Sequence, residues 1–236
     1  MPRPRAVVFD MDGLMFNSED VYQEVGTVLM RRRGCEYTRE LCDAIMGRPP
    51  RDCFETMIRY HGLDERWEAM AAESEEIFIS LLDGWLAPMP GLLELLDSLE
   101  AAGIPKAICT SSSGRLLHEC VSRFRMEPRF QFMLSAEDIV HGKPHPEIYL
   151  KAADQFGIEP HEMLVLEDSQ AGCRSAAAAG AMVVAVPGPH SSTQDFSAAD
   201  LIVESLADPR LYDVLGLKAP PGSSAAEEVR GDGVTE

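Results

Sequence analysis

The sequence predicts an α/β fold: a three-layer, Rossmann-like core with a parallel sheet, into which an all-helical cap domain is inserted. Three observations predict it. Short apolar, β-rich segments alternate with amphipathic helical segments through the second half of the chain, as in parallel strands joined by right-handed crossovers. A further apolar segment of the same kind stands near the N-terminus. Between this segment and the others, the hydrophobic pattern has only the helical period.

The first strand is expected at residues 6–9, where Ala-Val-Val-Phe forms a continuous apolar run typical of strands buried on both faces. Asp10, Asp12 and Gly13 follow it directly. Because successive side chains of a strand point to opposite faces, the two carboxylates are expected to share one face. Gly13 allows the backbone to turn sharply beside them.

Residues 17–84 are expected to form the helical cap. Val21, Val25 and Leu29 are spaced as one face of a helix, and a later apolar stripe of the same period begins at Trp67. This block contains no convincing strand pattern, so it is predicted to be an insertion placed directly after the Asp-x-Asp-Gly turn.

The core is expected to comprise residues 1–16 and 85–218, and the Pro-, Gly-, Ser- and acid-rich residues 219–236 are expected to be a disordered tail. Apolar runs predict the remaining strands at residues 105–110, 131–135, 163–167, 181–186 and 200–204. Amphipathic spacing predicts helices that begin near Leu92 and at residues 116–124, 146–156 and 172–179.

The charge balance limits the partners. The 236 residues include 21 lysines and arginines and 39 acids, so that 21 − 39 gives a net charge of −18. This charge repels nucleic acid and anionic lipid, and neither is an expected partner. No apolar run reaches the roughly 18 residues of a membrane span, no signal peptide is recognisable, and the six cysteines form no Cys-x-x-Cys pair. We therefore expect a reduced, cytoplasmic protein.

Polar residues follow four of the expected elements where the carboxyl ends of parallel strands meet, which is where open α/β sheets bind ligands. They supply carboxylates for a divalent cation, a hydroxyl with neighbouring backbone N–H groups, and a lysine. This set suits a phosphoryl group, because phosphoryl transfer depends mostly on positioning and charge stabilisation. The residues are Asp10, Asp12, Thr110, Ser111, Lys143, Glu167 and Asp168.

In these motifs the sequence resembles the haloacid dehalogenase-like superfamily, in particular its phosphatases and β-phosphoglucomutases with a helical cap after the first strand. The resemblance covers about residues 5–205. Its motifs, in the family's order, are Asp10-x-Asp12-Gly13, Thr110 after an apolar strand, Lys143-Pro144, and Glu167-Asp168 with Gly172 four residues further on.

The resemblance implies a role for each residue. Asp10 would be the nucleophile that forms an aspartyl phosphate. Asp12 would be the general acid and base, which protonates the leaving oxygen and then takes a proton from water. Thr110 and the N–H of Ser111 would bind the phosphoryl oxygens, and Lys143 would neutralise the charge of both reacting groups.

The same resemblance implies Mg²⁺ as the cofactor, a hard ion that keeps waters and uses few carboxylates. Its ligands would be the side chains of Asp10 and Asp168, the backbone carbonyl of Asp12, and Glu167 either directly or through water. The expected function is hydrolysis of a small phosphorylated metabolite, either a sugar phosphate or a nucleotide-like monophosphate.

A β-phosphoglucomutase-like activity is the alternative, and it requires basic or imidazole groups in the cap to hold a second phosphate. An ungapped alignment of the first motif places Ser18 and Tyr22 where the mutases have Thr and His, and residues 73–76 are acidic where they carry a lysine. These differences from the mutases favour the phosphatase activity over the mutase activity. In the cap, the candidates for substrate contact are Ser18, Tyr22, Arg48 and Arg51. Arg48 and Arg51 are candidates because by the resemblance their loop faces the substrate.

Three other interpretations are less favoured. Dehalogenases lack the second acid, so Asp12 argues against dehalogenation. A phosphoaccepting receiver-like module, the non-enzymatic alternative, uses similar groups but is about half as long and lacks the insertion. His141 and His145 flank Lys143 in a proline-rich turn, and we expect them to be solvated loop residues that are not metal ligands.

Overall fold

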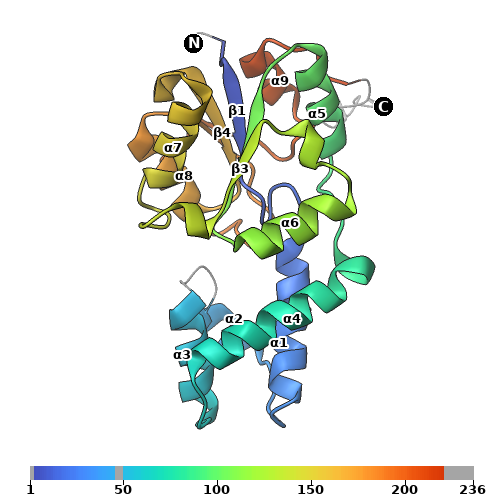
Figure 1. The fold of residues 1–236 in the computed structure, drawn as a ribbon, viewed down its shortest axis with the longest axis vertical. Coiled ribbons are helices and arrows are strands. Elements are labelled where there is room, and N and C mark those ends of the chain that lie inside the picture. The colour runs from blue at the N-terminus through green and yellow to red at the C-terminus, as the bar shows by residue number, and fades with distance from the viewer. Residues whose placement is uncertain (1–2, 46–49, 221–236) are drawn as a thin grey trace, which may run out of the picture.

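The computed structural model describes residues 3–45 and 50–220, and it confirms the α/β fold with a parallel sheet (Figure 1). Within these residues, six strands pair in parallel in the order β3-β2-β1-β4-β5-β6. The strands are β1 (Ala6–Phe9), β2 (Lys106–Cys109), β3 (Phe132–Leu134), β4 (Met163–Glu167), β5 (Met182–Ala185) and β6 (Leu201–Ile202).

The helices fall into two groups. Among the described residues, four come first after β1 and form the predicted insertion range: α1 (Ser18–Arg31), α2 (Arg39–Ile45), α3 (Pro50–His61) and α4 (Trp67–Trp85). Five others follow: α5 (Leu92–Ala101), α6 (Gly114–Arg123), α7 (Glu147–Phe156), α8 (Gln170–Ala179) and α9 (Pro209–Leu215). Short 3₁₀ turns cover Glu127–Arg129, Ala136–Asp138 and Pro160–Glu162.

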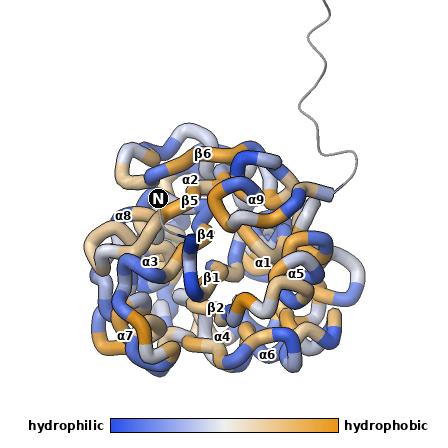
Figure 2. Tube along the Cα trace, turned by 90° about the horizontal axis from the view of Figure 1, so that it is seen from above, coloured by the Kyte–Doolittle hydropathy of each residue, from blue (hydrophilic) through white to orange (hydrophobic). Residues whose placement is uncertain are grey.

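Helices cover both faces of the sheet, which gives the core its three layers (Figures 1 and 2). On β1 the alternation of side chains decides the contacts: Val7 and Phe9 belong to one hydrophobic cluster, and Val8 belongs to the other. The first cluster contains the apolar residues of α5, α6 and α9, and the second contains those of α7 and α8. Because both faces are covered, β1 is completely buried, as its continuous apolar run predicts.

Helices α1 to α4 lie together beyond the carboxyl ends of the strands, with α1 packed along α4 (Figure 1). The two segments that connect this group to the core are joined to each other. The backbone N–H of Asn17 donates to the carbonyl of Ala87 (3.1 Å), and the Asn17 side-chain oxygen accepts from the Ala87 N–H (2.7 Å). The chain therefore leaves and re-enters the core at a single point.

Some elements differ from expectation. The last strand has two residues, although a strand was predicted at 200–204, because it pairs only with β5 at the edge of the sheet. The short helices α2 and α9 were not predicted. The start of α9 does carry a signal, since the Asp208 side chain caps the helix by accepting from the Arg210 N–H (2.9 Å) and Pro209 occupies its first position.

Two further sequence predictions concern the C-terminal tail and membrane-spanning segments. Most of the predicted tail, from residue 221 onward, lies outside the described residues, as do residues 46–49 in the cap. Among the described helices there is no candidate for a membrane-spanning segment, since none combines the necessary length and hydrophobicity.

Candidate active site

The turn after β1 places Asp10 at the centre of the sheet's carboxyl edge. Its N–H donates to the carbonyl of Leu166 on β4 (3.0 Å), which continues the sheet by one residue, and its side chain is buried. Gly13 has a φ of +74°, and a Cβ there would lie 2.3 Å from Oδ2 of Asp168. Only glycine therefore allows the turn to pass this close to the acid that follows β4.

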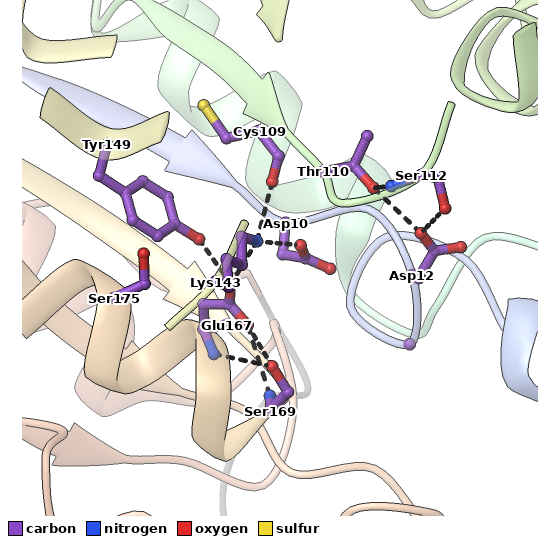
Figure 3. A network of polar contacts seen from close by, with 12 residues as sticks. Asp10, Asp12, Cys109, Thr110, Ser112, Lys143, Tyr149, Glu167, Ser169 and Ser175 are labelled. Atoms are coloured by element: carbon purple, nitrogen blue, oxygen red, sulfur yellow. Dashed lines mark hydrogen bonds and ion pairs between the residues drawn. The ribbon is translucent and has the colours of Figure 1, made fainter. Parts of the chain in front are cut away.

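Lys143 connects three elements at this edge (Figure 3). Its Nζ donates to Oδ1 of Asp10 (2.5 Å), to Oε1 of Glu167 (2.6 Å) and to the carbonyl of Cys109 at the end of β2 (3.1 Å). Only 6% of its side chain is exposed. Burial by itself lowers the pKa of Lys143, but the carboxylates of Asp10 and Glu167 outweigh it and hold the pKa well above the usual value. Lys143 is therefore a permanently charged, fixed cation.

Glu167 orients this lysine and is itself held on both oxygens. The hydroxyl of Tyr149 donates to Oε1 (2.5 Å), and the hydroxyl of Ser169 donates to Oε2 (3.0 Å) (Figure 3). Gly172, in the first turn of α8, lies against the same carboxylate: a Cβ at this position would be 1.9 Å from Oε1. The absence of a side chain at Gly172 thus determines where the carboxylate of Glu167 lies.

Gly172→Ala is expected to displace Glu167 and, with it, Lys143. We expect a loss of about 1 to 3 kcal/mol in the free energy of unfolding, from overpacking. Activity should fall by about 10² in kcat, since a displacement near 1 Å in a catalytic site has this effect. Urea unfolding and steady-state kinetics measure the two effects. The matched control is Gly84→Ala in α4, where an added Cβ has no atom within 4 Å; equal losses in both variants would contradict the assignment.

Three carboxylates meet beside this lysine. Oxygens of Asp10, Glu167 and Asp168 lie within 4.8 Å of one another, and all three residues are buried. Burial raises the pKa of Asp10 well above its ordinary value; Lys143 opposes the shift, and Glu167 and Asp12 add to it. Burial, then the charges of Asp10 and Glu167, also raises the pKa of Asp168. One lysine does not neutralise three buried acids, so this donor set fits an oxygen-preferring divalent cation.

Asp12 points away from this cluster toward the loop after β2 (Figure 3). Its Oδ2 accepts from the hydroxyls of Thr110 (3.0 Å) and Ser112 (2.7 Å), and the hydroxyl of Thr110 also accepts from the Ser112 N–H (3.0 Å). Its Oδ1 is buried without a hydrogen-bond partner among the described residues. Because buried polar atoms normally have a partner, this oxygen is a candidate for contact with substrate.

A cavity of about 470 Å³ is lined by Ser112, the hydrogen-bond partner of Asp12, and extends between the helices α1 to α4. On the core side it is lined by Ser111, Ser112 and Ser113, and on the cap side by residues that include Glu19 and Tyr22. Ion pairs and a hydrogen bond span the two sides beside it. They are Arg115–Glu76 (2.5 Å), Arg123–Asp83 (2.9 Å), His190–Asp20 (2.9 Å) and Ser113–Glu75 (3.2 Å).

The four residues predicted for substrate contact in the cap lie in different environments. Tyr22 lines the cavity. Ser18 is fully buried, accepts from the Gly13 N–H (3.2 Å) and is absent from the cavity wall, so it stabilises the turn of the first motif. Arg51 is exposed and pairs with Glu55 (2.7 Å), outside the wall that the described residues form. Arg48 lies outside the described residues.

The acidic segment 73–76 faces the cavity only in part. Glu73 points to the cap's own surface, where it pairs with Arg32 (2.8 Å) and Arg33 (2.7 Å). Glu75 lines the cavity and accepts from Ser113. The expected acidic wall therefore consists of this one residue of the segment, together with Glu19 from α1.

His141 and His145 lie outside the buried network. Their rings are 4.6 Å apart, and Nδ1 of His141 is 3.1 Å from Oε2 of Glu147. Both histidines are exposed, in agreement with their prediction as solvated loop residues. Glu147 accepts from the backbone N–H groups of Val140 and His141 (both 2.9 Å), so this carboxylate braces the loop that carries Lys143.

Sequence reasoning did not assign a site role to three residues that bind the predicted site carboxylates. Ser112, two residues after Thr110, donates to Asp12. Ser169 caps α8 by accepting from the Gly172 N–H (3.1 Å) while donating to Glu167. Tyr149 lies in an ordinary amphipathic helix, and its hydroxyl reaches Glu167 because α7 packs against β2 and α8 on this face of the sheet.

Comparison with known proteins confirms the resemblance. The family model described as "Haloacid dehalogenase-like hydrolase" matches residues 7–186. A Drosophila melanogaster protein named "Probable pseudouridine-5'-phosphatase" is 32% identical over 85% of this chain and 89% of its own length. The phosphorylated carbohydrates phosphatase of Thermotoga maritima is 31% identical over 74% of this chain and 81% of its own. Hexitol phosphatase B of Escherichia coli K12 is 27% identical over 92% of this chain and 100% of its own length.

Solved structures share the fold. CbbY from Rhodobacter sphaeroides, in complex with phosphate, has a TM-score of 0.76 with 23% identity and covers 86% of this chain and 95% of its own. The β-phosphoglucomutase from Clostridium difficile has a TM-score of 0.70 with 22% identity, and it covers 86% of this chain and 92% of its own. These two similarities show the fold.

Proposed function

This chain belongs to the haloacid dehalogenase-like hydrolase family, and we propose that it is a magnesium-dependent phosphatase that hydrolyses a small phosphomonoester through an aspartyl phosphate on Asp10. The observation that carries the proposal is the pairing of two unlike carboxylates. Asp10 is bound to a buried lysine, whereas one oxygen of Asp12 has no hydrogen-bond partner among the described residues. One acid is thus placed to react and the other to move a proton.

In the first step, an oxygen of Asp10 attacks phosphorus, and the bond from phosphorus to the ester oxygen breaks. Lys143 engages Oδ1 of Asp10, which leaves Oδ2 as the attacking atom. Protonated Asp12 gives its proton to the leaving oxygen, so that an alcohol departs. The hydroxyls of Thr110 and Ser112 keep Asp12 beside the reaction site.

In the second step, water attacks the phosphorus of the aspartyl phosphate and gives a proton to Asp12. The bond between phosphorus and Asp10 breaks, which releases inorganic phosphate and restores both acids. Throughout both steps Lys143 balances charge next to Asp10. Its hydrogen bonds to Glu167 and to the Cys109 carbonyl keep it in position without rearrangement.

We propose that Asp10 and Asp168 hold Mg²⁺ through their side chains and Asp12 through its backbone carbonyl. Mg²⁺ bound there would neutralise the phosphoryl oxygens as they approach the acids. Glu167 already accepts from Lys143, Tyr149 and Ser169, so in this proposal it reaches the ion through water.

The stabilisation by Mg²⁺ is expected to grow with pH. The raised pKa values of Asp10 and Asp168 mean that, without metal, their stabilising effect is present at low pH and is lost as pH rises through the folded-state values. Mg²⁺ binds the ionised forms, so protons compete with it at low pH. Near pH 8, Mg²⁺ at 100 times its Kd should add about 2.7 kcal/mol, roughly 5 to 10 °C in Tm.

Differential scanning fluorimetry with and without Mg²⁺ between pH 5 and pH 8 measures this gain. Taking the difference at each pH removes the effects of other acids. The gain should nearly disappear in Asp168→Asn. A gain that is independent of pH, or that persists in Asp168→Asn, would contradict the assigned ligands.

Hydrolysis is favoured over the mutase alternative by the charge of the cavity. A mutase must bind a second phosphate, yet the acidic wall residues among those described are Glu19 and Glu75, with no lysine, arginine or histidine. Relatives whose names describe phosphatases of carbohydrates, hexitols or pseudouridine 5′-phosphate support the same choice. The receiver-like alternative does not account for membership in a hydrolase family or for α1 to α4.

A phosphate-release assay tests the function. Purified protein with Mg²⁺ and a panel of phosphorylated sugars, hexitols and nucleosides should release inorganic phosphate, and EDTA should abolish the release. Conversion of β-glucose 1-phosphate to glucose 6-phosphate without stoichiometric phosphate release would instead establish the mutase.

A further inference from the structure

The cavity that Ser112 lines is placed to receive the alcohol portion of a substrate. Its core-side wall includes Ser112, whose hydroxyl donates to Asp12 (2.7 Å), and its cap-side wall includes Glu19, which follows Ser18 at the start of α1. One end of a molecule in the cavity would therefore lie next to the proposed proton donor. The volume of about 470 Å³ lies within the usual range of roughly 300 to 1,000 Å³ for small-molecule sites.

Among the described residues, three aromatic rings line this cavity, those of Tyr22, Tyr37 and Phe54. Two are held in position by their neighbours. The ring of Tyr22 lies 4.5 Å from that of Phe78, and Tyr37 packs directly on α1 at Gly26, where a Cβ would be 2.6 Å from the ring. Rigid aromatic faces stabilise a planar ring by stacking, at little cost in side-chain entropy.

Most of the remaining wall is aliphatic or contains sulfur. It includes Val25, Leu29, Ile45, Met57 and Leu116. A flexible polyol placed against such a wall would lose hydrogen bonds to water without gaining replacements, which is unfavourable. The wall therefore discriminates against open-chain sugar alcohols and favours a ring with apolar faces.

The charged groups in the described wall of the cavity are hydrogen-bond acceptors, and its other polar side chains are neutral hydroxyl, thiol and amide groups. Glu19 and Glu75 are the two carboxylates in the wall, and the described lining residues include no cationic side chain. Gln23 is already engaged, since its Nε2 lies 3.1 Å from the thiol sulfur of Cys42. Two carboxylates repel a second phosphate but accept readily from N–H and O–H groups.

We propose that the substrate is a nucleoside monophosphate whose base lies among Tyr22, Tyr37 and Phe54 and donates its N–H groups to Glu19 or Glu75. The proposal rests on the phosphatase function above and adds the class of the alcohol. A nucleoside combines the three properties that the wall selects: a planar ring, N–H donors, and no anionic group besides the phosphate that reacts.

The test compares kcat/KM for four kinds of phosphate donor. Uridine 5′-monophosphate and pseudouridine 5′-phosphate represent the proposed class, sorbitol 6-phosphate represents polyols, glucose 1,6-bisphosphate carries a second phosphate, and acetyl phosphate reports on the phosphoryl site alone. We expect a nucleoside monophosphate to exceed the sorbitol and glucose compounds by about tenfold or more. A preference for either of those compounds overturns the proposal, while phosphatase function stands as long as acetyl phosphate is hydrolysed.

Two variants on α3 test the aromatic contact. Phe54→Leu keeps an apolar side chain but removes the ring, and it should lower kcat/KM for the nucleoside monophosphate about tenfold more than for acetyl phosphate. Tyr60→Leu is the matched control, since Tyr60 is 43% exposed and is not a lining residue; it should change neither value. Equal effects of Phe54→Leu on both donors would overturn the proposal.

A binding measurement distinguishes failure of the nucleoside proposal from failure of the phosphatase function. Calorimetric titration of the Asp10→Asn protein with uridine or pseudouridine, which carry no phosphate, should show heat of binding that Phe54→Leu reduces about tenfold in affinity. Nucleoside binding without any phosphate release from the wild-type enzyme would sink the phosphatase function and support the nucleoside cavity. Absence of nucleoside binding would overturn the cavity assignment whatever the hydrolysis assay shows.

Discussion

Asp10→Asn is expected to reduce phosphate release by about 10⁴-fold or more, the scale of loss seen when a nucleophile is removed from an enzyme. A carboxamide is a poor nucleophile toward phosphorus and is nearly the same size as the carboxylate, so the variant should fold. Lys143 would keep an oxygen acceptor at the position of Oδ1, 2.5 Å away in the wild-type protein. Steady-state phosphate release and circular dichroism measure the two properties.

Asp154→Asn is a matched control for this variant. Asp154 lies on α7 and is exposed, away from the catalytic edge, so its replacement should leave the rate within twofold or so, as is usual for neutral surface substitutions. Full activity in Asp10→Asn would exclude the covalent mechanism. Lost activity accompanied by lost secondary structure would instead assign Asp10 a role in folding.

Lys143→Met is expected to lower the free energy of unfolding by about 3 to 5 kcal/mol, because it leaves buried carboxylates without their cation. Asp10 and Glu167 would then face each other across the space that Nζ occupies, 2.5 and 2.6 Å from their oxygens. Activity should also be lost, since no charge would balance the phosphoryl group as it approaches Asp10. Urea unfolding in the absence of Mg²⁺ measures the stability.

Two comparisons make this result specific to the buried charge. Lys151→Met removes a lysine whose side chain is 45% exposed, and it should change stability by no more than about 0.5 kcal/mol. The double variant Lys143→Met/Glu167→Gln should be more stable than Lys143→Met alone, because it also removes one of the uncompensated charges. If the double variant is less stable than the single one, charge compensation is not the role of Lys143.

The sequence predicted those parts of the fold and site that depend on local pattern. The apolar run before Asp10 identifies a buried strand, and the parallel sheet then brings Lys143 and Glu167 to the same edge. Gly13 and Gly172 could be recognised as part of the motifs, but the space that each leaves for a carboxylate could not: Gly13 lies against Asp168, and Gly172 lies against Glu167.

The remaining features depend on tertiary packing that no local pattern encodes. The hydroxyl of Tyr149 finds Glu167 across an interface between α7 and β4. Arg51 was a candidate for substrate contact, but it forms an ion pair with Glu55, one helical turn away. Such pairs are common on exposed helix faces. Ser18 was expected to contact substrate. Its burial beneath the turn at Gly13 could be seen only in three dimensions.

The covalent phosphoryl group on Asp10 is the central claim, and rapid-quench mass spectrometry tests it most directly. Protein mixed with Mg²⁺ and a substrate found in the phosphate-release assay, then quenched in acid within one turnover, should yield a peptide containing Asp10 that carries one phosphoryl group. Hydroxylamine should remove the group, as it does for acyl phosphates, and Asp10→Asn should not acquire it. Rapid turnover with no phosphorylated peptide at any quench time, or with the group on another residue, would contradict the mechanism.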